Sequence, residues 1–363
     1  MTYPLPKDTC DMLDSFVSRN INLGLALDKF VMVDGTTYAT TLDAKKRKKV
    51  PLNFGKDMKE LVTSAADRHQ AMLKSLNARI FIAAPDYRVV VGFGAEHVLE
   101  TNLYLHRIYG FPVIPGSALK GLARAFAFWE IAINLQLPAL DFDELDRRKR
   151  LPNPPPSPLQ LLDKLLSEGE DKKREKILKK LKDEPNCTAI DSLRNLTLAE
   201  WKEKAQDFYT IFGTQSKRGS ITFFDAYPTT APKLEPDILN PHFPDYYGDK
   251  TKTKPPSDNQ NPKPNYFLTV AAKQEFRFGV AGTLADKAES WLKQGLATLG
   301  VGGKTSSGYG FMNEIIRLTP EQQAENSLLL QIQKLDKKSY SINLVNTSRS
   351  GATCRTLRHT KKQ

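Results

Sequence analysis

Residues 295–312 read GLATLGVGGKTSSGYGFM, with six glycines between Gly295 and Gly310. An amphipathic stretch at 285–299 predicts a helix before this run, and YGFMNEIIRL (309–318) predicts a strand after it. A Gly-Lys-Thr within a glycine run suggests a nucleotide phosphate loop, but such a loop follows a strand and precedes a helix. The spacing disagrees as well, because Thr298 stands where the first glycine of that motif is required.

Two interpretations of the run remain. Gly302 and Gly303 could let the backbone approach a polynucleotide, with Lys304 as a point charge and Tyr309 as a ring on which a base stacks. Alternatively, the glycines only join a helix to a strand. The motif alone does not decide between an anion-binding loop and a connector.

A second stretch, IPGSALKG (114–121), predicts a helix N-terminus. Ser117 stands at the expected N-cap, Lys120 falls in the first turn, and Arg124 follows four residues later on the same face. Helix N-termini bind phosphates through unpaired N–H groups, so these residues are candidate RNA contacts. An ordinary capped helix with surface cations is the alternative.

The order of elements predicts the fold class. Strand patterns at 78–94, 219–228, 265–282 and 309–318 alternate with helix patterns after 116 and at 285–299. This order, strand-helix-strand-strand-helix-strand, predicts an α+β ferredoxin-like, RNA-recognition-like core. We expect three regions: an N-terminal helical segment (1–76) with a helix from Lys59 to about Leu76, the core (77–318), and a basic C-terminal extension (319–363). We expect two insertions in the core, an exposed, charged helical one at 136–206 and a loop excursion at 229–264.

The composition favours an anionic partner. The 363 residues include 53 Lys and Arg against 41 Asp and Glu, a net charge of +12, so nucleic acid is the first expectation. The three cysteines are far apart and show no zinc-ligand spacing, so we expect reduced thiols and neither a metal nor a cofactor. The first residues lack a signal-peptide pattern, and no apolar run is long enough to span a bilayer, so we expect a cytoplasmic protein without membrane partners.

Four stretches, in this order, resemble the RAMP superfamily, the RNA-recognition-like subunits of CRISPR effector complexes: GFPVIPGSALKG, FGTQSKRGSITFFDAYP, NPKPNYFLTV and LGVGGKTSSGYG. HVLETNLYLHRIYGFPVIPGSALKG and FLTVAAKQEFRF further resemble the sixth-subunit group of type III-B (Cmr) complexes. The resemblance implies a ferredoxin-like core whose glycine-rich loop and first helix hold CRISPR guide RNA near its 3′ end. It also implies other Cmr-complex subunits and target RNA as partners. The implied RNA contacts are Ser117, Lys120, Arg124, Gly302, Gly303, Lys304 and Tyr309, with Lys217 and Arg218 as weaker candidates.

The resemblance also bears on catalysis. In related backbone subunits, an aspartate in the loop before PGS cuts target RNA, and Glu100 lies at about that place here. His97 and His106 flank Glu100 and are plausible acid–base groups for RNA hydrolysis. We expect a non-catalytic subunit. The alternative is a RAMP endoribonuclease that cuts target RNA or processes guide RNA.

Overall fold

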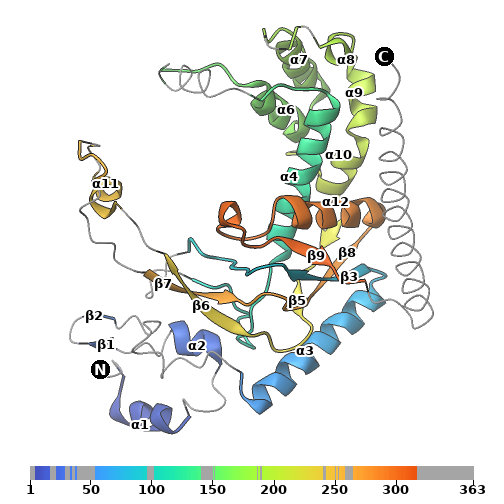
Figure 1. Ribbon diagram of the computed structural model, residues 1–363. Coiled ribbons are helices and arrows are strands. Elements are labelled where there is room, and N and C mark those ends of the chain that lie inside the picture. The colour runs from blue at the N-terminus through green and yellow to red at the C-terminus, as the bar shows by residue number, and fades with distance from the viewer. Residues whose placement is uncertain are drawn as a thin grey trace, which may run out of the picture. The chain divides into compact units, whose positions relative to one another are not determined.

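The structure is a computed structural model (Figure 1). It describes residues 5–16, 22–28, 33–34, 37–38, 54–95, 102–139, 150, 152–185, 187–188, 190–239, 243–249, 251, 253–257 and 265–316. Internal contacts divide the chain into two units, Met1–Ile315 and Ile316–Gln363. The basic extension expected from residue 319 therefore falls within the second unit, outside the described residues. In the described part of the chain, no helix has both the length and the apolar character needed to cross a bilayer.

The described residues of the N-terminal part form three helices and a small two-stranded sheet. Their bounds are α1 (Lys7–Phe16), α2 (Leu23–Asp28), β1 (Val33–Asp34), β2 (Thr37–Tyr38) and α3 (Lys56–Ser75). The helix expected at 59–76 is α3, which begins three residues earlier. The basic run at 45–49 lies outside the described residues.

An antiparallel sheet forms the core of the first unit. Its strands are β3 (Arg79–Pro85), β4 (Thr222–Phe223), β5 (Tyr227–Pro228), β8 (Phe276–Ala281) and β9 (Met312–Glu314). They are hydrogen-bonded in the order β4-β8-β3-β9, with β5 also on β8. Helix α4 (Gly116–Asn134) connects β3 to β4, and α12 (Ala285–Thr298) connects β8 to β9. This is the predicted strand-helix alternation, and the prediction of an α+β ferredoxin-like core is confirmed.

Alternation of side chains along the strands assigns each face of the sheet to different helices. On one face, Phe81 stacks on Phe278 at 4.9 Å between ring centroids, and the ammonium of Lys293 in α12 lies 4.9 Å from the Phe81 ring. On the other face, Gly279 lies against Leu73 of α3 so closely that a Cβ would overlap the leucine side chain. Helices α4 and α12 pack together on the first face and α3 covers the second (Figure 1).

The excursion expected at 229–264 begins with regular structure. Residues Leu234–Leu239 form β6, which pairs antiparallel along its whole length with β7 (Asn265–Val270) in a separate two-stranded sheet. Strand β6 contains three charged or proline residues and shows no alternation of apolar and polar side chains, so the sequence pattern did not predict it. Helix α11 (Pro244–Gly248) lies within the remainder of the excursion.

The helical insertion is packed, which corrects our expectation of an exposed charged helix. It contains α6 (Pro158–Ser167), α7 (Asp171–Lys182), α8 (Asp191–Arg194), α9 (Leu198–Lys204) and α10 (Gln206–Phe212). The buried residues of these helices belong to the same hydrophobic cluster as the sheet and α4; they include Leu161, Leu162, Leu165, Leu166, Leu178, Leu181, Leu193, Trp201, Phe208 and Ile211. Leucines recur three or four residues apart on α6 and α7, so each helix buries one stripe while its other faces stay charged.

Candidate functional site

The glycine loop, residues 299–310, connects α12 to β9 and contains one short 3-10 turn at Thr305–Ser307. Gly302 has a φ of +91°, and a Cβ there would overlap the carbonyl oxygen of Val90. The N–H of Gly303 donates to that same carbonyl at 2.8 Å, and the N–H of Gly310 donates to the Arg88 carbonyl at 2.7 Å. The close backbone approach at Gly302 and Gly303 is therefore made to another segment of this chain. We expected these two glycines to let the backbone approach a polynucleotide, but packing against Val90 within the chain accounts for them.

Lys304 is the unusual residue of this loop. Its backbone is left-handed, with φ +59° and ψ +30°, a region that lysine rarely occupies. Its ammonium lies 5.3 Å from the ring centroid of Phe267, 5.7 Å from that of Phe93 and 5.8 Å from that of Tyr309. Aromatic faces attract a cation at such distances. Lys304 is half-buried and pairs with no carboxylate in the described part of the chain, so the rings hold a positive charge that nothing described neutralises.

Tyr309 is buried, with 6% of its surface exposed, and its hydroxyl donates to Asp237 of β6. Burial raises the pKa of this hydroxyl, and the neighbouring Asp237 carboxylate raises the pKa further. The expectation that a base stacks on Tyr309 is therefore wrong in the described conformation, because the ring faces the protein interior. The exposed aromatic side chain here is Tyr87, whose ring meets the Tyr309 ring edge-on at 5.3 Å and is 47% exposed.

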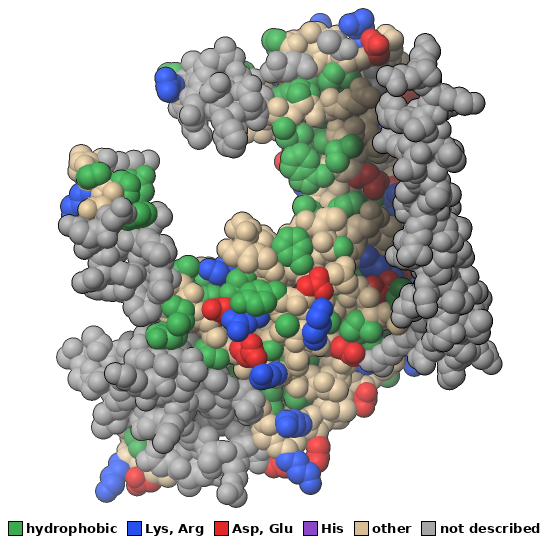
Figure 2. Space-filling view, in the orientation of Figure 1, with side chains coloured by type: hydrophobic (Ala, Val, Ile, Leu, Met, Phe, Trp, Pro, Cys, Tyr) green, Lys and Arg blue, Asp and Glu red, His purple; other side chains and the backbone are tan. Residues whose placement is uncertain are grey.

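Charges around the loop are mixed in sign. Arg88 pairs with Asp237, and its other terminal nitrogen lies 3.2 Å from Glu235. Its guanidinium also lies 5.1 Å from the Tyr87 ring centroid. Figure 2 shows the same pattern more widely: over the strands, Lys and Arg side chains alternate with Asp and Glu. This face is not uniformly positive. An anionic ligand would therefore be attracted here by an unpaired cation such as Lys304 more than by the net charge of the chain.

The start of α4 differs from the prediction in its cap. Pro115 is the N-cap residue, and Ser117 lies inside the first turn, exposed, without a capping hydrogen bond. The N–H of Gly116 instead donates to Oδ1 of Asp225 at 2.7 Å. A carboxylate from the segment between β4 and β5 thus satisfies part of this helix end, and only the tertiary fold brings it there. Lys120 is half-buried and forms no ion pair with a described residue.

Arg124 has a structural role that the sequence did not indicate. Its guanidinium pairs with Asp163 of α6 at 2.8 Å, donates to Ser167 at 3.1 Å, and lies 5.4 Å from the ring centroid of Phe208 in α10. These contacts join α4 to the helical insertion. The Arg124 guanidinium, which we predicted to contact RNA, is therefore already paired with a carboxylate of this chain.

Lys217 and Arg218 lie in a tight turn between α10 and β4. The turn is closed by the Gly213–Arg218 bridge and by the N–H of Thr214, which donates to the Lys217 carbonyl at 2.8 Å. Both basic side chains are exposed and make no ion pair with a described residue. They remain candidates for RNA contact.

His69 and Asp225 line a cavity of about 480 Å³ beside the start of α4, between α3 and the β4–β5 segment. His69 is 7% exposed, stacks on Tyr227 at 4.2 Å, and finds no hydrogen-bond partner for either ring nitrogen among the described residues. Burial lowers the pKa of His69 to about 4, which keeps the imidazole neutral. No pattern in the sequence singled out His69.

His106, a candidate acid–base group, is engaged in its own turn. Its Nδ1 accepts the N–H groups of Ile108 and Tyr109, both at 3.2 Å, and burial lowers its pKa. Because Nδ1 is an acceptor in both bonds, any proton on the neutral ring sits on Nε2. His97 and Glu100, the other two candidates, lie outside the described residues.

Comparisons with known proteins agree with the resemblance seen in the sequence. The RAMP superfamily profile matches residues 85–313. The CRISPR system Cmr subunit Cmr6 of Pyrococcus furiosus is 36% identical over 256 residues, which cover 68% of this chain and 70% of the relative. The corresponding subunit of Saccharolobus solfataricus is 32% identical over 125 residues, covering 31% of this chain and 39% of the relative.

Two solved structures are also similar. The crystal structure of Cmr6 from Pyrococcus furiosus matches with a TM-score of 0.40 and 34% identity, covering 66% of this chain and 98% of that one. A chain of the type III-B Cmr-beta complex bound to cognate target RNA matches with a TM-score of 0.40 and 17% identity, covering 79% of this chain and 78% of that one. On the strength of the profile match and the Pyrococcus relative, this chain belongs to the RAMP superfamily.

Proposed function

We propose that this chain is a non-catalytic, RNA-binding subunit of a type III-B CRISPR ribonucleoprotein. In this proposal the glycine loop and the start of α4 hold guide RNA near its 3′ end, and the chain assembles with other Cmr subunits around guide and target RNA. The identity of its Cmr6 relatives supports the assignment to such a complex.

The observation that carries the RNA-binding proposal is Lys304. A lysine in a left-handed conformation is maintained only where its surroundings impose it, and such residues are concentrated at functional sites. Here the loop holds an unpaired ammonium among three rings, where a phosphate oxygen would complete its coordination. Lys120 supplies a second unpaired cation, and Tyr87 an exposed ring beside the loop. Lysines act as point charges on a nucleic-acid backbone and carry no base specificity, as suits a subunit that accepts any guide sequence.

Among the described residues, which do not include His97 and Glu100, no contact favours the endoribonuclease alternative. His106 accepts two backbone N–H groups and stacks on Tyr109 at 4.7 Å, so its position is explained by the turn. We propose that cleavage, where it occurs, belongs to a neighbouring subunit.

The salt dependence of RNA binding tests the proposal. Each lysine–phosphate contact contributes about 0.7 to the slope of log K against log salt concentration for single strands. Lys120→Gln combined with Lys304→Gln should therefore lower the slope for an unstructured guide-like RNA by about 1.4. The matched control is Lys59→Gln with Lys74→Gln, two exposed lysines of α3, which should leave the slope unchanged. Equal slopes for the two double variants would reject the site.

A further inference from the structure

The helical insertion carries a groove that the proposed site does not use. It lies between α7 and the start of α9 and has a volume of about 640 Å³. Four lysines of α7 line it and define what we call the lysine row: Lys172, Lys176, Lys179 and Lys182. Their spacing of four, three and three residues places them on one helical stripe. The opposite wall is formed by Leu196, Thr197 and Leu198.

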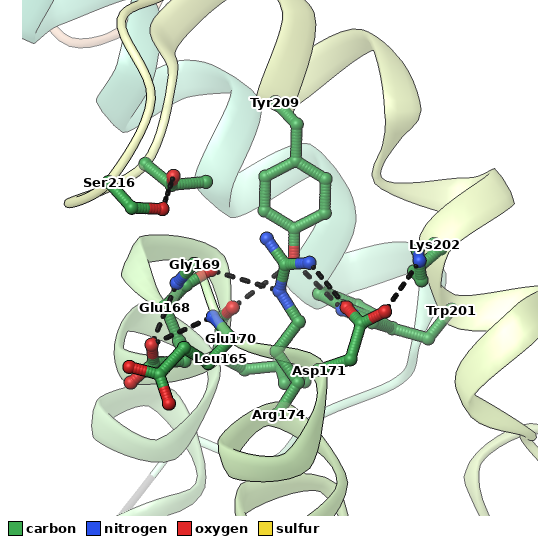
Figure 3. A network of polar contacts seen from close by, with 11 residues as sticks. Leu165, Glu168, Gly169, Glu170, Asp171, Arg174, Trp201, Lys202, Tyr209 and Ser216 are labelled. Atoms are coloured by element: carbon green, nitrogen blue, oxygen red, sulfur yellow. Dashed lines mark hydrogen bonds and ion pairs between the residues drawn. The ribbon is translucent and has the colours of Figure 1, made fainter.

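A network on the buried side of α7 fixes the direction of the row (Figure 3). Arg174 is buried; its Nε donates to the Glu168 carbonyl at 2.9 Å, and its guanidinium lies 4.4 Å from the ring centroid of Tyr209 in α10. Asp171 accepts from Arg174 at 2.9 Å and from Lys202 of α9 at 2.8 Å, so it links the two helices. With this face held inward, the row must face the groove.

Unlike three neighbouring cations of the insertion, the lysines of the row have no partner among the described residues. Lys173, Arg174 and Lys202 each pair with a carboxylate at 2.7 to 2.9 Å. No lysine of the row forms an ion pair with a described residue, and three of the four are exposed, Lys182 being half-buried.

Glu175 and Glu200 lie near the row. Glu175 is the one acidic residue among the described residues that line the groove. Glu200 lies near Lys182, but its carboxylate accepts a hydrogen bond from the N–H of Thr197 at 2.7 Å. The described lining of the groove therefore carries four lysines against one glutamate, an excess of positive charge.

We propose that the lysine row binds the phosphate backbone of RNA, as a second contact surface separate from the glycine loop. The inference rests on the proposed function, because it takes RNA to be the ligand. At about 1.5 Å per residue the row spans roughly 15 Å, enough for about four phosphates at the ~3.4 Å spacing of one stacked strand.

A protein partner fits the groove less well. Protein interfaces are depleted in lysine and depend on Trp, Tyr and Arg anchors. The described residues that line the groove include none of these three. Two of its three leucines offer little surface to an apolar anchor, since Leu178 and Leu196 are 4% and 3% exposed, while Leu198 is half-buried. The lysine ammonium groups are point charges that do not read bases, and they suit the repeating phosphates of a nucleic-acid backbone.

The test compares two double variants of the full chain with equal charge. Lys176→Gln with Lys179→Gln removes the two central charges of the row. Lys164→Gln with Lys180→Gln removes two exposed lysines of α6 and α7 that do not line the groove and pair with no described residue. Binding of an unstructured single-stranded RNA is measured by fluorescence anisotropy across a salt series. We expect the row variant to lower the slope by about 1.4, and the control to match the parent.

Equal slopes for both double variants would overturn the inference. So would loss of a co-assembling protein subunit from the row variant alone with the RNA slope unchanged, because the groove would then bind protein. Lys304→Gln is measured in parallel. If it lowers the slope by about 0.7 and the row variant does not, only the further inference fails. If the row variant lowers the slope and Lys304→Gln does not, the glycine-loop site fails and the row stands.

Discussion

Replacing Lys304 with glycine separates the two roles this residue could have. If the side chain serves mainly to hold the loop, its removal destabilises the protein. If the side chain serves RNA, its removal weakens binding and leaves the fold nearly intact. Glycine is the informative substitution because it adopts the left-handed backbone of Lys304 without strain.

Two opposing changes set the expected stability. The ammonium lies 5.3 to 5.8 Å from three ring centroids, near the outer limit of cation–π attraction, so each contact is worth about 0.5 kcal/mol and their loss costs about 1.5 kcal/mol. Relief of the left-handed strain returns about 1 kcal/mol. The free energy of unfolding should therefore fall by only about 0.5 kcal/mol, and Tm by less than about 3 °C.

RNA binding should change clearly in the same variant, with the salt slope lower by about 0.7 for one lost phosphate contact. The control is Gly302→Ala, two residues away, where a Cβ overlaps the Val90 carbonyl and φ is +91°. That variant should lose about 3 kcal/mol of stability. Unchanged RNA binding by Lys304→Gly, together with a stability loss as large as that of Gly302→Ala, would show that Lys304 is a structural residue and not an RNA contact.

Three further predictions follow from the geometry. Asp225→Ala removes the acceptor of the Gly116 N–H and should lower the free energy of unfolding, measured in urea, by about 1 kcal/mol, whereas Ser117→Ala should lower it by less than about 0.5 kcal/mol. The reverse order would show that Asp225 does not cap α4. Burial lowers the pKa of His69 from 6.5 to about 4, so the unfolded chain binds more protons between these values and stability should fall as pH drops through this range. His69→Phe should flatten this pH dependence of stability, and an unchanged profile in that variant would argue against the role of His69. Glu100→Gln in the assembled complex should leave every target-RNA cut in place on sequencing gels, and loss of one cut with RNA binding intact would make this chain a nuclease.

The regular elements of the core could be predicted from the sequence because their patterns are local. Helix α12 appears in the apolar periodicity of 285–299, and the strand patterns predict the main-sheet strands in their order along the chain, but not the separate pairing of β7. The insertion was misjudged for a physical reason. Its charged residues outnumber its leucines, but burial depends on where the leucines fall: Leu178 and Leu181 lie on one stripe against neighbouring helices.

The site was harder to predict because its decisive contacts are long-range. Lys304 and the glycines stand out in the sequence, yet the burial of Tyr309 depends on Asp237, 72 residues away, in a strand that the pattern concealed. Likewise Asp225 caps α4 from 109 residues away, and Arg124 is occupied by Asp163 of the insertion. A motif shows which residues are unusual. The tertiary fold determines which of them remain available to a ligand.

The proposed function depends above all on contact between the glycine loop and RNA. The most direct measurement is photocrosslinking of guide-like RNA substituted with 4-thiouridine to the full chain, followed by mass spectrometry of the crosslinked peptides. We predict crosslinks within residues 299–310 and at Tyr87 beside the loop, and their loss in Lys304→Gly. Crosslinks confined to other parts of the chain, and unaffected by that substitution, would contradict the claim.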